Sequence, residues 1–131
     1  MAAVESMILD TCALLWLAAG SKKLRKSVLK QIDQTPAVYV SAISGFEISL
    51  KAAGGKLELP NPTKEWLEKV VAHHGLTLLS LELDVCIAAA ELPHIHDDPC
   101  DRFIIAAAKL HDLPVVTNDK RFEAYGIIII N

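Results

Sequence analysis

The feature that most constrains the fold is a series of short apolar segments, each followed by a stretch in which apolar residues recur at helical spacing. Residues 7–10 (MILD) run directly into residues 11–19, which predict a helix ended by Gly20. Residues 37–41 (AVYVS) repeat the arrangement, with a helix expected at residues 43–53. Segments that are apolar at successive positions have both faces buried, as in a parallel sheet covered by helices on two sides. We therefore predict an α/β fold.

The same alternation continues to the end of the chain. Strands are predicted at residues 7–10, 37–41, 76–80, 114–117 and 127–130. Helices are predicted at residues 11–19, 22–34, 43–53, 63–74, 84–92 and 99–111, with a helical turn at residues 119–126. Thr63 and Asp98 are expected to cap the helices behind them, and Pro99 suits a first helical position.

Size and composition indicate a single globular domain. The 131 residues are 52% hydrophobic, which is ample for one core, and we assign residues 1–131 to one domain. The apolar run at residues 11–20 is too short to cross a bilayer, and no basic secretory segment precedes it. The three cysteines form no C-x-x-C pair, which disfavours a disulfide framework or a structural zinc site. We expect a cytoplasmic protein without a membrane partner.

The charge balance leaves the class of substrate open. The chain has 13 basic and 16 acidic residues, whereas nucleic-acid-binding proteins usually have a basic excess. If several acids surrounded a metal ion, however, the remaining surface would be close to neutral. Net charge therefore neither supports nor excludes a nucleic-acid substrate.

Four acidic residues occupy equivalent places in the predicted fold. Asp10 ends the first strand, Glu47 lies in the first turns of the helix after the second strand, Asp101 opens a later helix, and Asp119 follows the strand at residues 114–117. In a right-handed α/β winding these places meet at one edge of the sheet, where ligands bind. We expect the four carboxylates to converge there.

Each of these acids also has a purely structural interpretation. Asp10 and Asp119 can cap helices, Ser44 and Glu47 form a possible capping box, and Asp101 can stabilise the positive end of its helix. Four acids that converged only as caps would repel one another, which is costly unless a cation neutralises them. Hard oxygen ligands favour Mg²⁺, with Mn²⁺ as an alternative, and a carboxylate-held divalent ion is typical of phosphodiester hydrolysis. A nuclease is the leading interpretation.

Several motifs together also resemble a known family. They are LDT after the first strand, SAISGFEISLKAAGGKL at residues 41–57, LPHIHDDPCDRFIIAAA at residues 92–108, and VTND at residues 116–119. In combination they resemble the PIN-domain ribonucleases, specifically VapC-type toxins of bacterial toxin–antitoxin pairs, over nearly the whole chain from Met7. The resemblance implies a PIN-like three-layer fold with a mostly parallel central sheet, and it leaves residues 1–6 as an N-terminal extension.

The resemblance also implies roles for individual residues. Its metal-site acids correspond to Asp10, Glu47, Asp101 and Asp119, and its polar positions beside the site correspond to Thr11 and Thr117. The implied activity is endonucleolytic cleavage of RNA, and the implied partners are a cognate antitoxin and a second copy of the chain. The apolar run at residues 14–17 and the amphipathic segment at residues 22–34 are candidate interface segments, with core filling as the alternative for Leu14 and Leu17.

Other charged residues near these motifs have weaker assignments. Asp98 is expected to cap its helix and can also hold a metal-bound water, while Lys51, Arg102 and Lys120 are possible contacts for RNA phosphates. His94 and His96 could bind zinc from a loop, but the sequence places no further soft ligands beside them.

The sequence is also compatible with other functions. A dehalogenase-type phosphatase needs a second acid two residues after the first, and Cys12 occupies that position. A receiver domain needs an acidic pair near its first strand, and Asp10 is the one acid there. A non-catalytic PIN-like binding domain, whose acids hold a structural ion or cap helices, is the alternative from a different class.

Overall fold

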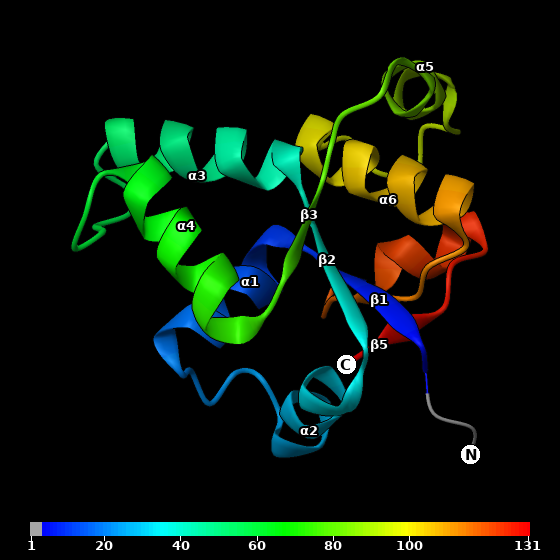
Figure 1. Ribbon diagram of the computed structural model, residues 1–131. Coiled ribbons are helices and arrows are strands. Elements are labelled where there is room, and N and C mark those ends of the chain that lie inside the picture. The colour runs from blue at the N-terminus through cyan, green and yellow to red at the C-terminus, as the bar shows by residue number, and fades with distance from the viewer. Residues whose placement is uncertain (1–3) are drawn as a thin grey trace.

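The computed structural model describes residues 4–131, and the five strands of these residues form one parallel sheet (Figure 1). The strands are β1 (Ser6–Leu9), β2 (Ala37–Ser41), β3 (Thr77–Leu79), β4 (Val115–Val116) and β5 (Ile129–Ile130). Their order across the sheet is β3-β2-β1-β4-β5, and each neighbouring pair is parallel. The predicted α/β class is confirmed.

The helices fall close to the predicted ranges. They are α1 (Thr11–Ala19), α2 (Lys26–Gln34), α3 (Ala42–Ala53), α4 (Thr63–His74), α5 (Leu83–Glu91) and α6 (Pro99–His111), followed by the short 3₁₀ helix η1 (Lys120–Tyr125). Among the described residues, no helix is long and apolar enough to cross a membrane.

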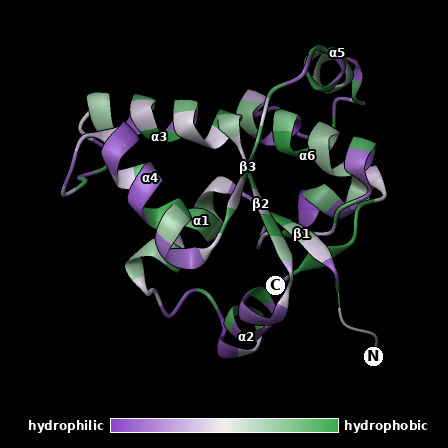
Figure 2. Cartoon of the chain, viewed as in Figure 1, coloured by the Kyte–Doolittle hydropathy of each residue, from purple (hydrophilic) through white to green (hydrophobic). Residues whose placement is uncertain are grey.

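The central strand β1 is buried on both faces of the sheet, as its apolar sequence requires. Met7 and Leu9 of β1 belong to one core cluster, with buried residues of α1, α2 and α4. Ile8 points the opposite way and joins a second cluster formed mainly by α5, α6 and η1. All three side chains have no exposed surface. Figure 2 shows hydrophobic residues along the central strands.

The strand order predicts where a ligand would bind. β1 pairs with β2 on one side and with β4 on the other, so the direction of winding reverses between β1 and β4. Ligands of open α/β sheets bind outside the carboxyl ends of the strands at such a point. Asp10 directly follows β1, and the Asp10 N–H donates to the Val116 carbonyl of β4 at 3.1 Å.

The structure corrects several predicted helix starts. α2 begins at Lys26 rather than residue 22, and the residue before α4 is Pro62, with no side-chain cap from Thr63. α3 begins at Ala42, where the Ser41 hydroxyl accepts from the Ile43 N–H at 3.2 Å. The proposed capping box of Ser44 and Glu47 is therefore wrong, because both residues lie inside the helix.

The chain start differs in detail from the expected extension at residues 1–6. Ser6 already belongs to β1 and is paired with Ala37 of β2. Residues 1–3 lie outside the described residues.

Candidate metal centre

Asp10 is held rigidly at the end of β1. Its side chain is 6% exposed and accepts a hydrogen bond from the Ala13 N–H at 2.7 Å, which caps α1. Burial raises the pKa of Asp10, while hydrogen bonds from Thr117 and the Ala13 N–H oppose this rise. Glu47 and Asp119 are close enough to raise the pKa further by charge repulsion. Asp10 is thus both a helix cap and a member of an acidic cluster.

Two threonines fix the elements around Asp10. The buried Thr117 hydroxyl hydrogen-bonds to Asp10 and accepts from the Asp119 N–H at 3.0 Å, so it joins the ends of β1 and β4. The Thr11 and Ser44 hydroxyl oxygens lie 2.9 Å apart in the interior, which joins α1 to α3. Thr117 therefore contacts Asp10 and Asp119, whereas the hydrogen-bond partner of Thr11 is Ser44.

Asp98 and Asp101 have different roles at the start of α6. Asp98 accepts from the N–H groups of Cys100 at 2.9 Å and Asp101 at 3.4 Å, which confirms it as the N-cap. Asp101 lies in the first helical turn, and burial together with the Asp98 charge raises its pKa to about 7, against a smaller opposing effect of His96. A carboxylate that folding makes this difficult to ionise is suited to a cation.

Asp119 has the opposite electrostatic environment. The Arg121 side chain donates to both carboxylate oxygens, Nε to Oδ1 at 3.0 Å and Nη2 to Oδ2 at 2.8 Å. This pairing, joined by the Arg121 N–H and by His96, lowers the pKa of Asp119 to about 2. Asp119 also caps η1 through the Arg121 N–H. It is therefore ionised throughout the physiological range.

Glu47 reaches the cluster from α3. Its Oε2 lies 3.3 Å from Lys51 Nζ one helical turn away. Its Oε1 is the one buried side-chain oxygen or nitrogen of residues 4–131 without a hydrogen-bond partner. The Glu47 charge also contributes to the raised pKa values of Asp10 and Asp101. Glu47 therefore interacts electrostatically with two of the other predicted acids, and it has a buried acceptor that lacks a donor.

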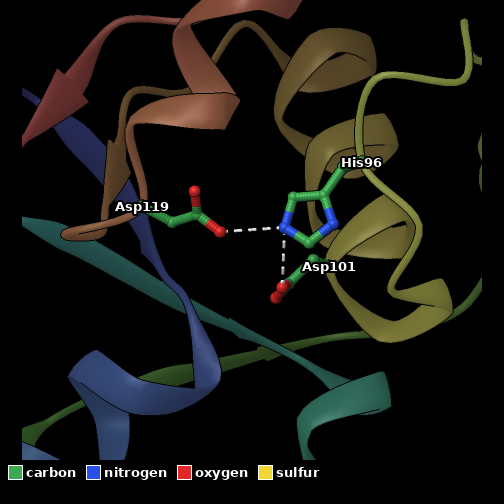
Figure 3. A group of neighbouring side chains, drawn as sticks. All are labelled: His96, Asp101 and Asp119. Atoms are coloured by element: carbon green, nitrogen blue, oxygen red, sulfur yellow. Dashed lines mark hydrogen bonds and ion pairs between the residues drawn. The ribbon is translucent and has the colours of Figure 1, made fainter.

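His96 completes the group and was not predicted as a site residue. It is 1% exposed, and its Nε2 lies 2.9 Å from Asp119 Oδ2 and 3.1 Å from Asp101 Oδ2 (Figure 3). Among the described residues, His96, Asp101 and Asp119 each offer a potential ligand atom within 4.8 Å of the others. Because His96 lies on a loop, no helical or strand periodicity indicated that it points inward.

The donor set fits a hard divalent cation. Four carboxylates from separate elements offer oxygen atoms, and burial makes Asp10 and Asp101 unfavourable as bare anions. The unpartnered Glu47 Oε1 is the atom a cation would satisfy. Oxygen-rich sites of this kind suit Mg²⁺ or Mn²⁺ rather than the softer ions that prefer thiolate.

The structure gives Arg102 a different role from the predicted phosphate contact. The side chain is buried and donates to four carbonyl oxygens, those of Ala90 and Leu92 through Nη2 and of Pro93 and His96 through Nη1. Its donors are used to fix the loop before α6, so it is not a phosphate contact. Lys51 is partly engaged by Glu47, and Lys120 is exposed beside Asp119.

Leu14 and Leu17, two residues of the apolar run considered as an interface, are buried in the core cluster of α1. For these two residues the core-filling alternative is confirmed.

Comparison with known proteins gives consistent matches over nearly the full chain. Ribonuclease VapC22 of Mycobacterium tuberculosis is 28% identical over 123 residues, which cover 93% of each protein. The crystal structure of VapBC2 from Rickettsia felis bound to a promoter DNA fragment has a chain with a TM-score of 0.73 at 15% identity, over 96% of this chain and 98% of that one. FitAcB from Neisseria gonorrhoeae gives a TM-score of 0.63 at 24% identity, over 95% and 96% of the two chains.

The family assignment rests on a further match. The sequence model of the PIN domain family matches residues 7–128, which include all four predicted acids. This match agrees with the parallel sheet, with the acids at its switch point, and with the family resemblance of the sequence motifs. The chain belongs to the PIN domain family.

Proposed function

We propose that this protein is a divalent-metal-dependent endoribonuclease that acts in the cytoplasm as the toxin of a toxin–antitoxin pair. The observation that carries the proposal is the convergence of Asp10, Glu47, Asp101 and Asp119, with the buried Glu47 Oε1 left without a donor. The name of the mycobacterial relative supports ribonuclease activity, and the toxin–antitoxin complex from Klebsiella pneumoniae, with a TM-score of 0.62, is consistent with it.

Different residues of the chain have different roles in the proposed reaction. When bound, Mg²⁺ or Mn²⁺ supplies positive charge that activates water and stabilises the negative charge developing on a phosphodiester. The four acids would hold the cation from four separate segments, so its position would depend on the packing of α1, α3 and α6. Thr117 fixes Asp10 and the Asp119 backbone relative to each other. Lys51 and Lys120 are the basic residues we assign to phosphate contact at the rim.

A non-catalytic function is favoured by one specific observation. Asp10, Asp98 and Asp119 each make a capping hydrogen bond, so three acids have a structural use without any metal. Capping does not account for Glu47, which lies inside α3 and has the unpartnered oxygen. A binding domain with a structural ion would bind the cation but would not cleave RNA.

The deciding experiment is cleavage of a panel of structured and unstructured RNAs by the purified chain. We expect cleavage with Mg²⁺ or Mn²⁺ and none with EDTA, and we expect Asp10→Asn to be inactive. Asp33→Asn on exposed α2 is the matched control, since it removes the same charge outside the acidic cluster. A chain that binds Mn²⁺ and leaves every RNA intact would favour the binding domain instead.

We also propose a cognate antitoxin with a basic side chain directed at the acids. A guanidinium near clustered carboxylates competes with a metal for them, and an amphipathic segment in a groove supplies affinity. Arg121 already makes such a pairing with Asp119 within this chain. Addition of the antitoxin should suppress cleavage and weaken Mn²⁺ binding, and an antitoxin that binds without changing either would contradict the proposal.

A further inference from the structure

His96 is fixed in place by contacts to every part of the residue. Its N–H donates to the Tyr125 hydroxyl at 2.8 Å, and its carbonyl accepts from Arg102 Nη1 at 3.1 Å. The imidazole packs edge-to-face on Phe122, with ring centroids 5.7 Å apart. The Tyr125 hydroxyl in turn donates to the Pro93 carbonyl at 2.7 Å, which ties the loop to η1. A loop residue is thus held with little freedom of rotation.

The two ring nitrogens of His96 face different kinds of group. Nδ1 lies 3.1 Å from the Asp98 backbone nitrogen, which can only donate. Nδ1 must therefore accept, and the neutral imidazole carries its proton on Nε2. This Nε2 is the atom near Asp101 and Asp119, whose carboxylate oxygens accept hydrogen bonds.

We propose that His96 is a positioning residue that donates its Nε2 proton to the Asp101 and Asp119 carboxylates and does not ligate the metal. A nitrogen that carries a proton has no lone pair for a cation, so the proximity of three potential ligand atoms does not make His96 a ligand here. The inference concerns the metal site on which the proposed function rests. The tautomer of His96, however, can be measured in the metal-free protein.

The arrangement links the two elements that carry these acids. Asp101 belongs to α6, whereas Asp119 precedes η1, and one N–H shared between them limits how far their carboxylates can separate. Such a bond also balances part of the negative charge before a cation arrives. Hydrogen-bonding partners of metal ligands typically change metal affinity 10- to 100-fold when they are removed, so the same range of effect is expected here.

The tautomer can be measured directly by long-range ¹⁵N–¹H correlation spectra of protein labelled at histidine. His96→Asn identifies the His96 signals among the five histidines. We expect a protonated Nε2 and an unprotonated Nδ1 in the metal-free chain, with the same pattern after Mg²⁺ is added. A proton on Nδ1, or loss of the Nε2 proton when Mg²⁺ binds, would overturn the inference.

A pair of variants tests the positioning role through Mn²⁺ affinity, measured by calorimetry. His96→Gln can place an amide N–H near the former Nε2, whereas His96→Leu fills similar space without a donor. We expect His96→Leu to weaken Mn²⁺ binding by about 10- to 100-fold and His96→Gln to restore most of it. His94→Gln, on the same loop but exposed, is the control and should bind as the wild type does.

The outcomes separate this inference from the proposed function. Equal losses in His96→Gln and His96→Leu, or no loss in His96→Leu, would contradict a donor role. A wild-type chain that binds no Mn²⁺ would contradict the metal site, and the spectra alone would then decide the role of His96. If His96→Leu does not fold, the wild-type spectra and His96→Gln still decide it.

Discussion

Asp101 has a strongly raised pKa, because burial and the Asp98 charge disfavour its ionised form. Its folded pKa is about 7 against an ordinary value of 3.8, so between these values the folded state binds more protons than the unfolded state. The free energy of unfolding of the metal-free protein should therefore fall as pH rises through this window. Asp119, with a pKa of about 2, remains ionised in the folded state there.

Urea unfolding in EDTA at a series of pH values checks this prediction. The wild type should lose stability between about pH 5 and pH 7, and Asp101→Asn should show a smaller slope because it has no proton to lose. Asp10 contributes in the same direction, since burial also raises its pKa, so some slope remains in the variant. A wild type whose stability rises across this range would mean that ionised Asp101 is stabilised in the fold.

Removal of one charge from the cluster should separate stability from activity. We expect Asp10→Asn and Asp101→Asn each to abolish RNA cleavage while the metal-free fold holds or gains stability, because repulsion among the acids is relieved. Mg²⁺-dependent cleavage rates and thermal unfolding in EDTA measure the two effects. Either variant cutting RNA at the wild-type rate would remove that residue from the metal site.

At the scale of single residues, the sequence predicted the site residues whose places follow from the order of strands and helices. It missed the residue whose orientation depends on a loop. Asp10, Asp101 and Asp119 could be placed because each lies where a predicted strand ends or a predicted helix begins. His96 could not, since its orientation depends on Tyr125 and Arg102, which bind its backbone from 29 and 6 residues away. For the same reason Arg102 was predicted as a possible phosphate contact, although its four acceptors are carbonyl oxygens of the end of α5 and the loop that follows.

Among the secondary-structure elements, α6 begins at a side-chain cap that accepts two hydrogen bonds. Asp98 accepts from the Cys100 and Asp101 N–H groups at the helix start, so Asp98→Ala should lower the free energy of unfolding by about 1 kcal/mol. Cleavage should fall less than in Asp101→Ala, because the Asp101 carboxylate remains. Asp97→Ala, at the exposed neighbouring position, is the control. Equal loss of cleavage with unchanged stability would instead make Asp98 a metal ligand.

Helix and strand positions were predictable where a buried pattern repeats, and less so where a cap decides the boundary. β1 and β2 have apolar runs buried on both faces, which left little choice of structure for them. The start of α3 was misplaced because Ser41 and Ser44 are both plausible caps. The structure uses Ser41 as the cap and commits Ser44 to a hydrogen bond with Thr11, a contact 33 residues away that local sequence does not indicate.

At the scale of the whole molecule, two helices that both pack against α6 each expose a pair of apolar side chains. On α3, Phe46 and Leu50 are 56% and 55% exposed, and on α5, Leu83 and Ile87 are 72% and 47% exposed. Each pair is separated by four residues and therefore lies on one face of its helix. Figure 1 shows α3 and α5 on the same side of the molecule as α6. Exposed apolar faces on neighbouring helices are typical of a protein interface.

We therefore expect a homodimer in solution that uses the exposed faces of α3 and α5. Leu83→Lys should shift the protein toward monomer in sedimentation experiments at tens of micromolar, because a charge would be buried at the contact. Ile128→Lys is the matched control, since Ile128 is 74% exposed but lies before β5 rather than on these helices, and it should leave the assembly unchanged. Thermal unfolding of both variants tests whether each retains its fold. A wild type that sediments as a monomer would contradict the dimer. Dissociation by Ile128→Lys instead of Leu83→Lys would place the interface near Ile128 rather than on α3 and α5.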